Sequence, residues 1–132
     1  MKATKEEMLW LLNDTVEYYS KDVNRRCGTN ATSCFYSPYS VGKGNISDGC
    51  AIGRWMTIEQ KEAADDKYEN TSVRDLPDEL LPNMLKKYSL IFLSGIQSLH
   101  DSDKYWGAKG LSTSGISKVD NIKKLIEWGM YD

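Results

Sequence analysis

The stretch NMLKKYSLIFLSGIQSLH, residues 83–100, is the best candidate in this sequence for a central core helix. Its apolar residues recur with the 3.6-residue period of an α-helix and therefore share one face. These residues are Met84, Leu85, Tyr88, Ile91, Phe92, Gly95, Ile96 and Leu99. Glycine in a helix interior lowers stability by about 1 kcal/mol relative to alanine, so Gly95 indicates close packing against another element. We predict one helix from Asn83 to His100, which Pro82 opens or kinks.

Two further helices are predicted near the ends of the sequence. Thr4 and Glu7 form a T-x-x-E capping-box pattern before a run of apolar residues at helical spacing. This first helix is expected to fade between residues 20 and 24. Towards the other end, Ser117 is expected to cap a last helix, with Trp128 packing near its end. The apolar residues of that helix are Val119, Ile122, Leu125 and Ile126.

Between the first and the central helix, residues 34–46 combine aromatic and β-branched residues with Pro38 and a glycine-rich turn. This composition predicts a small antiparallel β-hairpin before Cys50, with the proline restricted to a sheet edge or a bulge. Thr57 and Gln60 repeat the capping-box pattern, and Pro77 fits the first turn of another short helix. The predicted fold class is therefore α+β, predominantly helical with about four helices, in a single globular domain over residues 1–132.

The composition is that of a globular protein, with 40% hydrophobic and 27% charged residues. A formal net charge of −2 argues against nucleic acid as the partner, since proteins that bind its phosphates carry a basic surplus. The acidic pair Glu6 and Glu7 stands where a secretion signal would be apolar, and the longest apolar run is too short to span a membrane. We therefore expect a cytoplasmic protein without a membrane partner, whose oligomeric state is left open.

Three cysteines, Cys27, Cys34 and Cys50, accompany a single histidine, His100. An odd number of cysteines without a secretion signal predicts reduced thiols. A zinc site with three thiolates and the imidazole can be drawn, but it lacks the closely spaced ligand pair of such sites. We therefore expect buried thiols, and neither a metal nor another cofactor.

Polar and aromatic residues from three segments can form one ligand pocket. Arg54 is a forked donor suited to carboxylate or phosphate, and Tyr36 and Trp106 can stack on a base or another aromatic group. His100 and Asp101 end the central helix, where the imidazole either contacts the ligand or is stabilised by the helix dipole. The alternatives are exposed ion pairing for the arginine and packing in the core or at its rim for the aromatic residues.

The segment from Gly107 to Ser117 is rich in glycine and hydroxyl groups and precedes the last helix. Ser112, Thr113 and Ser114 can donate hydrogen bonds to an anion at this helix start. The segment is not a P-loop, because the order G-x-x-x-x-G-K-[ST] is missing. An ordinary capped loop is the alternative interpretation.

Three short motifs together resemble small accessory proteins of bacteriophages and prophages. They are CAIGR at residues 50–54, QSLHD at residues 97–101, and the following Trp106. In that family a C-A-I/V-G element follows a hairpin, and a helix that ends in L-Q-x-x-H-D precedes a tryptophan. The similarity covers roughly residues 16–115 and carries no activity over to individual residues. It implies a dispensable phage protein in the host cytoplasm, a class that includes inhibitors of host defence.

The leading hypothesis is a non-enzymatic binding protein of phage type that holds a nucleotide-like anionic ligand to counter host defence. In this hypothesis Arg54 contacts the charge, Trp106 or Tyr36 stacks, and residues 112–114 donate hydrogen bonds. A second hypothesis is an inhibitor that binds a host protein through a surface, supported by the acidic runs at residues 62–66 and 75–79. A third is a small hydrolase with Cys50 as nucleophile beside His100.

Overall fold

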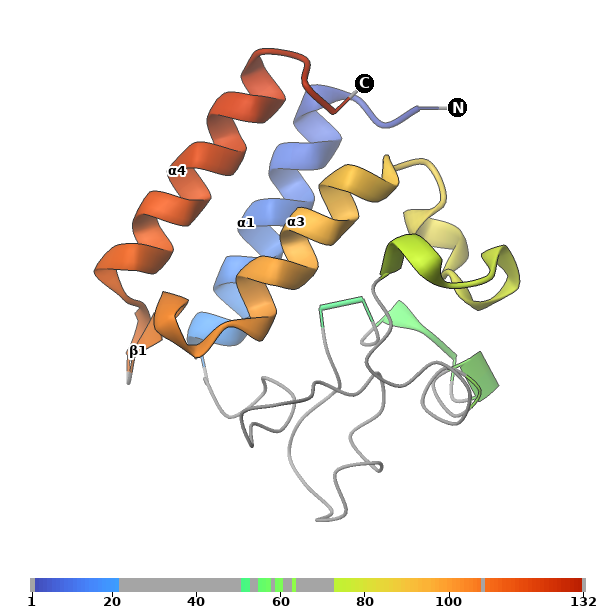
Figure 1. The fold of residues 1–132 in the computed structure, drawn as a ribbon, viewed down its shortest axis with the longest axis horizontal. Helices are drawn as coiled ribbons and strands as arrows, with labels where there is room; N and C mark the ends of the chain where they lie inside the picture. The colour runs from blue at the N-terminus through green and yellow to red at the C-terminus, as the bar shows by residue number, and fades with distance from the viewer. Residues whose placement is uncertain are drawn as a thin grey trace.

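The computed structural model describes residues 2–21, 51–52, 55–57, 59–60, 63, 73–107 and 109–131. Within them three α-helices have defined bounds: α1 (Lys5–Lys21), α3 (Leu90–Asp101) and α4 (Thr113–Glu127). The start of α1, the start of α3 and the end of α4 lie at the same end of the molecule (Figure 1). Among the described residues no helix has the length and apolar character needed to cross a bilayer.

Short turns and one β-hairpin connect these helices. The 3-10 turns η4 (Val73–Asp75), η5 (Asp78–Leu80) and η6 (Asn83–Leu85) precede α3, and η7 (Asp103–Tyr105) follows it. Strands β1 (Trp106–Gly107) and β2 (Gly110–Leu111) then pair in antiparallel register. The predicted α+β class with mainly helical content is therefore confirmed. The predicted count of about four helices is not confirmed, because three have bounds in the described part of the chain.

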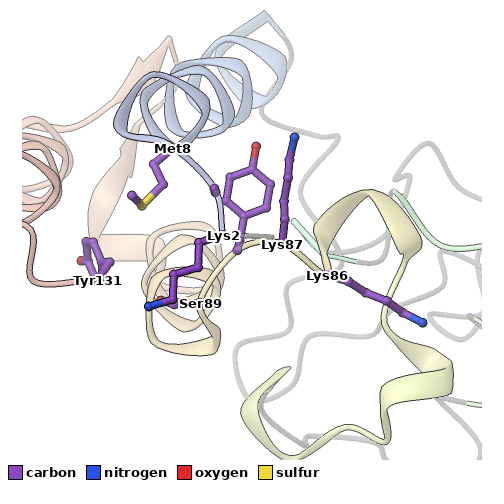
Figure 2. A pocket seen from close by; sticks show the side chains of 8 residues that line it. Lys2, Met8, Lys86, Lys87, Ser89 and Tyr131 are labelled. Carbon is purple, nitrogen blue, oxygen red and sulfur yellow. The ribbon is translucent and has the colours of Figure 1, made fainter.

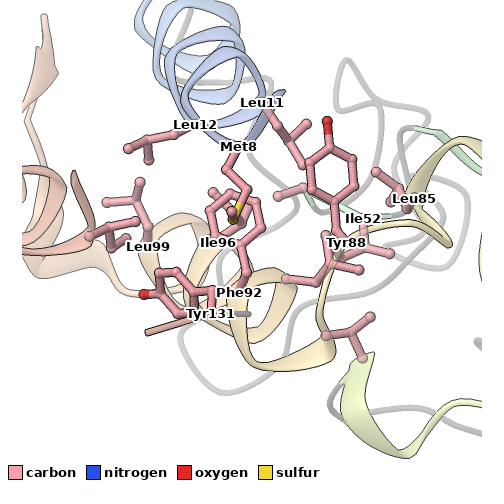
Figure 3. Close-up of a cluster of buried hydrophobic side chains, with 14 of the residues drawn as sticks. Met8, Leu11, Leu12, Ile52, Leu85, Tyr88, Phe92, Ile96, Leu99 and Tyr131 are labelled. Carbon is pink, nitrogen blue, oxygen red and sulfur yellow. The ribbon is translucent and has the colours of Figure 1, made fainter. Parts of the chain in front are cut away.

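The core fills the space between the three helices (Figure 3). Each helix contributes side chains with at most 1% of their surface exposed. They are Leu11 and Leu12 from α1, Phe92, Leu93, Ile96 and Leu99 from α3, and Ile122 and Ile126 from α4. Full burial of one such side chain stabilises a fold by about 1.5–3 kcal/mol. This shared core is therefore the main force that holds the helices together.

The sequence predicts the start and the buried face of α1 correctly. The Thr4 amide donates to Glu7 Oε1 over 2.9 Å, and the Glu7 amide donates to Thr4 Oγ1 over 3.1 Å, which is the expected capping box. The helix ends at Lys21, inside the predicted range. Its buried residues are Met8, Leu11, Leu12, Thr15 and Tyr19. The second predicted capping box, between Thr57 and Gln60, also forms, with distances of 3.0 and 3.1 Å.

The central helix is shorter than predicted. The prediction of one helix from Asn83 to His100 is wrong, because α3 begins only at Leu90 and η6 precedes it as a separate turn. Ser89 separates the two elements with an extended backbone, φ −65° and ψ 145°. Its side chain caps α3 by accepting a hydrogen bond from the Phe92 amide over 3.0 Å. A serine before an apolar run is itself a helix-start signal, which the continuous apolar period obscured.

The predicted buried face of the central helix is largely confirmed, with a difference at its edge. Ile91, predicted to face the core, is 59% exposed, whereas Leu93 is fully buried. Phe92, Ile96 and Leu99, also predicted to face the core, are fully buried. The expectation that Trp128 packs near the end of the last helix is also wrong, because this side chain is 66% exposed.

The last helix begins earlier than predicted. Ser117 is not its cap: Ser112 accepts a hydrogen bond from the Gly115 amide over 3.1 Å, and α4 starts at Thr113. The segment rich in glycine and hydroxyl groups thus contains β2 and the first turn of α4. The hairpin expected at residues 34–46 lies outside the described residues, so it stays a prediction.

Two glycines inside helices have opposite surroundings. A Cβ atom at Gly95 would lie 3.6 Å from the Tyr131 hydroxyl, which is an ordinary van der Waals contact. A Cβ atom at Gly115 would lie 2.0 Å from the Tyr105 carbonyl oxygen, which belongs to the backbone and cannot turn aside. The close approach of α4 to η7 therefore requires glycine at position 115. The predicted packing at Gly95 is present, but it leaves room for a methyl group.

Replacing each glycine by alanine tests this difference in packing. Gly95→Ala should stabilise the protein by about 0.5–1 kcal/mol, because alanine favours the helix and has room here. Gly115→Ala should destabilise it by about 1–3 kcal/mol or more, because the added carbon overlaps the backbone. Urea titrations give the free energy of unfolding of both variants. A marked loss of stability in Gly95→Ala would contradict the contact with Tyr131 described above.

Candidate functional site

Two of the predicted site residues at the end of α3 belong to the core. His100 is fully buried, and its ring meets the Tyr19 ring edge-on with 4.7 Å between the centroids. Trp106 is 8% exposed and lies 6.2 Å from the same tyrosine ring. Its indole N–H donates to the Leu99 carbonyl over 2.8 Å. The structure thus brings His100 and Trp106 together, but inside the packed protein, where a ligand from solvent does not reach the imidazole.

The hydroxyl groups at the start of α4 are divided between the fold and the surface. Ser112 Oγ donates to the Lys104 carbonyl over 2.6 Å and accepts from the Gly115 amide. A hydroxyl has one proton to donate, and the Ser112 hydroxyl donates it to the Lys104 carbonyl rather than to a ligand. Thr113 and Ser114 are exposed on the first turn of the helix. The two hydrogen bonds of Ser112 cap the start of α4 and connect it to η7.

The remaining predicted site residues lie at the end of α3 or outside the described residues. Asp101 is the last residue of α3. Arg54, Tyr36 and Cys50 lie outside the described residues, so their predicted roles stay predictions. The burial of His100 also removes it as an accessible general base, which the hydrolase hypothesis needs.

Two serine variants distinguish a capped joint from an anion site at the start of α4. Ser112→Ala should lower the free energy of unfolding by about 1 kcal/mol or more, because the helix cap is lost together with the bond to Lys104. Ser114→Ala should change it by less than about 0.5 kcal/mol, since most substitutions of exposed residues have small effects. Urea unfolding measures both values. Equal stability of the two variants would rule out a structural role for Ser112.

A cavity lies at the opposite end of α3, where this helix begins. Its volume is about 240 Å³, and its walls come from the start of the chain, α1, the residues before α3 and the turn after α4 (Figure 2). The lining residues are Lys2, Ala3, Met8, Lys86, Lys87, Tyr88, Ser89 and Tyr131. Figure 2 shows Lys86 pointing away from the others. Lys2 and Lys87 are therefore the cations that matter most for a ligand.

Contacts with the start of α1 hold the residues that precede α3. The Ala3 amide donates to the Lys87 carbonyl over 2.9 Å, and the Tyr88 hydroxyl donates to the Glu7 carbonyl over 3.1 Å. The Lys87 ammonium also forms an ion pair with the Glu7 carboxylate. These three contacts fix the backbone just before Ser89. They thereby keep η6 and α3 apart and create the wall of the cavity.

The turn after α4 forms the other wall. Gly129 has a positive φ of 71°, a conformation that glycine adopts without strain, and it reverses the chain at the helix end. The Met130 amide then donates to a carbonyl in the last turn of α4 over 3.0 Å. This geometry places the Tyr131 ring against Phe92, with 5.3 Å between the centroids. Tyr88 also stacks on Phe92 at 5.6 Å, so the buried Phe92 ring supports both tyrosines that line the cavity.

Ion pairing sets the charges at the cavity. The hydrogen bond with Lys87 lowers the pKa of the Glu7 carboxyl, and the same bond raises the pKa of the Lys87 ammonium. Lys87 therefore remains a cation at neutral pH and does not act as a base. Lys86 pairs with Asp78 over 3.5 Å. Lys2 has no ion-pair partner among the described residues, so its charge is available to a ligand.

The remaining groups at the cavity are neutral or partly positive. Burial raises the pKa of the Tyr88 and Tyr131 phenols, which therefore carry no negative charge at neutral pH. The first turn of α3 has no acidic residue, and its amides give the helix start a partial positive charge. Ser89 adds a hydroxyl group at the same place. The cavity therefore favours an anion with an apolar or aromatic part.

The described residues contain no group of three or more histidine, cysteine, aspartate or glutamate residues that could hold a metal ion. No family model, curated protein or solved structure matches this chain. The resemblance to phage accessory proteins and the role in host defence that it implies stay predictions.

Sequence reasoning missed this cavity because it placed Lys86 and Lys87 inside one long helix. The available signal is a capping serine, Ser89, before an apolar run, with Lys86 and Lys87 one residue further back, which marks a helix start with cations beside it. The part played by Tyr131 has no comparable signal, because it depends on how the chain turns after α4.

Proposed function

We propose that this chain is a non-enzymatic binding protein whose cavity at the start of α3 holds a small, nucleotide-like organic anion. The proposal rests on one observation. Lys2, which has no ion-pair partner among the described residues, the ion-paired Lys87 and the rings of two tyrosines line the same cavity. The anionic group of the ligand would lie at Lys2 and Ser89, beside the Lys87–Glu7 ion pair. Its flat part would lie against the rings of Tyr88 and Tyr131, above Met8.

The volume of the cavity limits the size of this ligand. Sites for drug-sized molecules measure about 300–1,000 Å³. The cavity here, at about 240 Å³, lies below that range. The proposal is therefore restricted to mononucleotides and smaller organic anions, and the larger of these would extend beyond the mouth of the cavity.

The chemistry of the lining supports binding rather than catalysis. Among the described residues that line the cavity, none is a histidine, cysteine, aspartate or glutamate, the side chains that most often transfer protons or attack substrates. The raised pKa of Lys87 disfavours its use as a base at neutral pH. The raised pKa values of the two tyrosines have the same consequence for their phenols.

The acidic run at residues 75–79 carries little unpaired negative charge, which the hypothesis of a surface inhibitor requires. Asp75, Asp78 and Glu79 are exposed, but Asp78 is paired with Lys86 over 3.5 Å. Arg74 is exposed beside them. This pairing reduces the negative field that mimicry of nucleic acid requires, so the run does not add to the proposal.

Calorimetric titration with AMP, inorganic phosphate and adenosine tests the proposed function. AMP carries both the anionic and the aromatic part, phosphate only the charge, and adenosine only the ring, so AMP should bind tightest. Lys2→Met should weaken the binding of AMP about tenfold, the effect of losing about 1.4 kcal/mol of charge interaction. Lys109→Met, an exposed lysine in the β1–β2 turn, is the matched control and should bind as the wild type does.

Two results would overturn the proposal. One is the absence of heat for AMP and for cyclic AMP at protein concentrations of about 100 μM, where even weak complexes form. The other is AMP binding that Lys2→Met and Lys109→Met change equally, because the site would then lie elsewhere. Circular dichroism of each variant checks that the fold is intact.

A further inference from the structure

The ion pair between Lys87 and Glu7 stands at the edge of the cavity. Lys87 lines the cavity, whereas Glu7 belongs to the first turn of α1 and is not among the lining residues. Figure 2 shows the Lys87 side chain extending towards α1, where the Glu7 carboxylate binds its ammonium group. An acidic residue beside the cavity therefore holds one of the cations that line it.

The exposure of this ion pair allows it to open. The Lys87 and Glu7 side chains are 40% and 37% exposed, so water and salt screen the attraction between them. Ion pairs of this exposure contribute little to stability. The backbone at Lys87 is held separately, because its carbonyl accepts a hydrogen bond from the Ala3 amide over 2.9 Å. The lysine side chain can therefore move while the wall of the cavity stays in place.

Glu7 keeps other favourable contacts when the lysine leaves it. Lys87 binds the Oε2 atom of the carboxylate, whereas the Oε1 atom accepts a hydrogen bond from the Thr4 amide over 2.9 Å. The carboxylate also stands in the first turn of α1, where the helix dipole stabilises negative charge. Departure of the ammonium group thus leaves the carboxylate hydrogen-bonded and in a favourable field.

The Lys87 ammonium group is within reach of a ligand in the cavity. It lies 5.7 Å from the centroid of the Tyr88 ring, which lines the same cavity. The four-carbon stem of lysine is flexible and ends in three donors. A phosphate monoester carries about −1.5 to −2 charges at neutral pH and three acceptor oxygens, whereas a carboxylate carries one charge. A phosphate beside this ion pair is therefore the stronger partner for the ammonium group.

We propose that Glu7 is an internal competitor of the ligand: an anionic group in the cavity takes the Lys87 ammonium from the Glu7 carboxylate. This inference rests on the proposed function and adds to it a means of setting the affinity. In the empty protein the ion pair is neutral, and Lys2 supplies the charge that attracts the ligand. In the complex Lys2 and Lys87 together hold the anionic group, while Glu7 keeps its hydrogen bond with Thr4. Glu7 thus weakens binding, because the ion pair has to open.

Calorimetric titration of Glu7→Gln with AMP tests this competition. Glutamine can keep the capping box with Thr4 but carries no charge, so the variant leaves Lys87 without its carboxylate partner. AMP should bind Glu7→Gln about threefold more tightly than the wild type, the effect of a weak ion pair that no longer has to open. Adenosine, which has no anionic group, should bind both proteins equally.

Glu6→Gln is the matched control. It removes the same charge from the neighbouring residue of α1, which is exposed and does not pair with Lys87. This control should bind AMP as the wild type does. Equal tightening in Glu6→Gln and Glu7→Gln would overturn the inference, because the loss of any nearby negative charge would then explain it. Weaker binding of AMP by Glu7→Gln would overturn it as well.

Lys87→Met, added to Glu7→Gln, shows whether Lys87 is the group that the ligand gains. The double variant should lose the gain and bind AMP as tightly as the wild type or more weakly. A gain that survives the loss of the lysine would contradict the exchange of partners. Circular dichroism of each variant checks that the helices are intact.

The same titrations separate this inference from the proposed function. Wild-type binding of AMP that Lys2→Met weakens and Glu7→Gln leaves unchanged would refute the competition and leave the site standing. The absence of heat with AMP for the wild type and for Glu7→Gln would overturn both.

Discussion

The extended backbone at Ser89 is the constraint on which the rest of this structure depends. Contacts with Ala3 and with the first turn of α1 hold the two residues before Ser89. The Ala3 amide donates to the Lys87 carbonyl, and the Tyr88 hydroxyl donates to the Glu7 carbonyl. Because these residues are fixed, the apolar pattern of residues 83–100 cannot form one helix. The break supplies a new helix start and a wall for the cavity.

The two ends of α3 consequently serve different purposes. At its C-terminal end, the Trp106 indole N–H donates to the Leu99 carbonyl. Gly115 lies against the Tyr105 carbonyl, so backbone and side chains are closely packed there. At its start, lysines and tyrosines surround a space of about 240 Å³. Buried polar groups that are bonded to the backbone mainly stabilise a fold, whereas a cavity with available charge can bind a ligand. The candidate site therefore lies near Ser89, at the start of α3, and not near His100, at its end.

The sequence predicts this fold well where local signals decide the outcome. The capping boxes at Thr4 and Thr57 form as expected, and the buried face of α1 follows its apolar period. It predicts poorly where distant contacts decide: the break at Ser89 depends on α1, some 80 residues earlier in the chain. The exposure of Trp128 and the placement of Tyr131 depend on the turn at Gly129. Of the predicted site residues that the structure describes, none lines the cavity. Chemical type alone suggests His100 and Trp106, whereas their burial is a property of the fold.

The central claim is that a small anion binds at the start of α3 and not at the start of α4. Amide chemical shifts in a ¹⁵N-labelled sample, followed during titration with AMP, test this claim most directly. We predict that the largest shifts occur at Ser89, Leu90, Ile91 and Tyr131, which line or border the cavity. Largest shifts at Ser112 to Gly115, with the amides at the start of α3 unchanged, would contradict it.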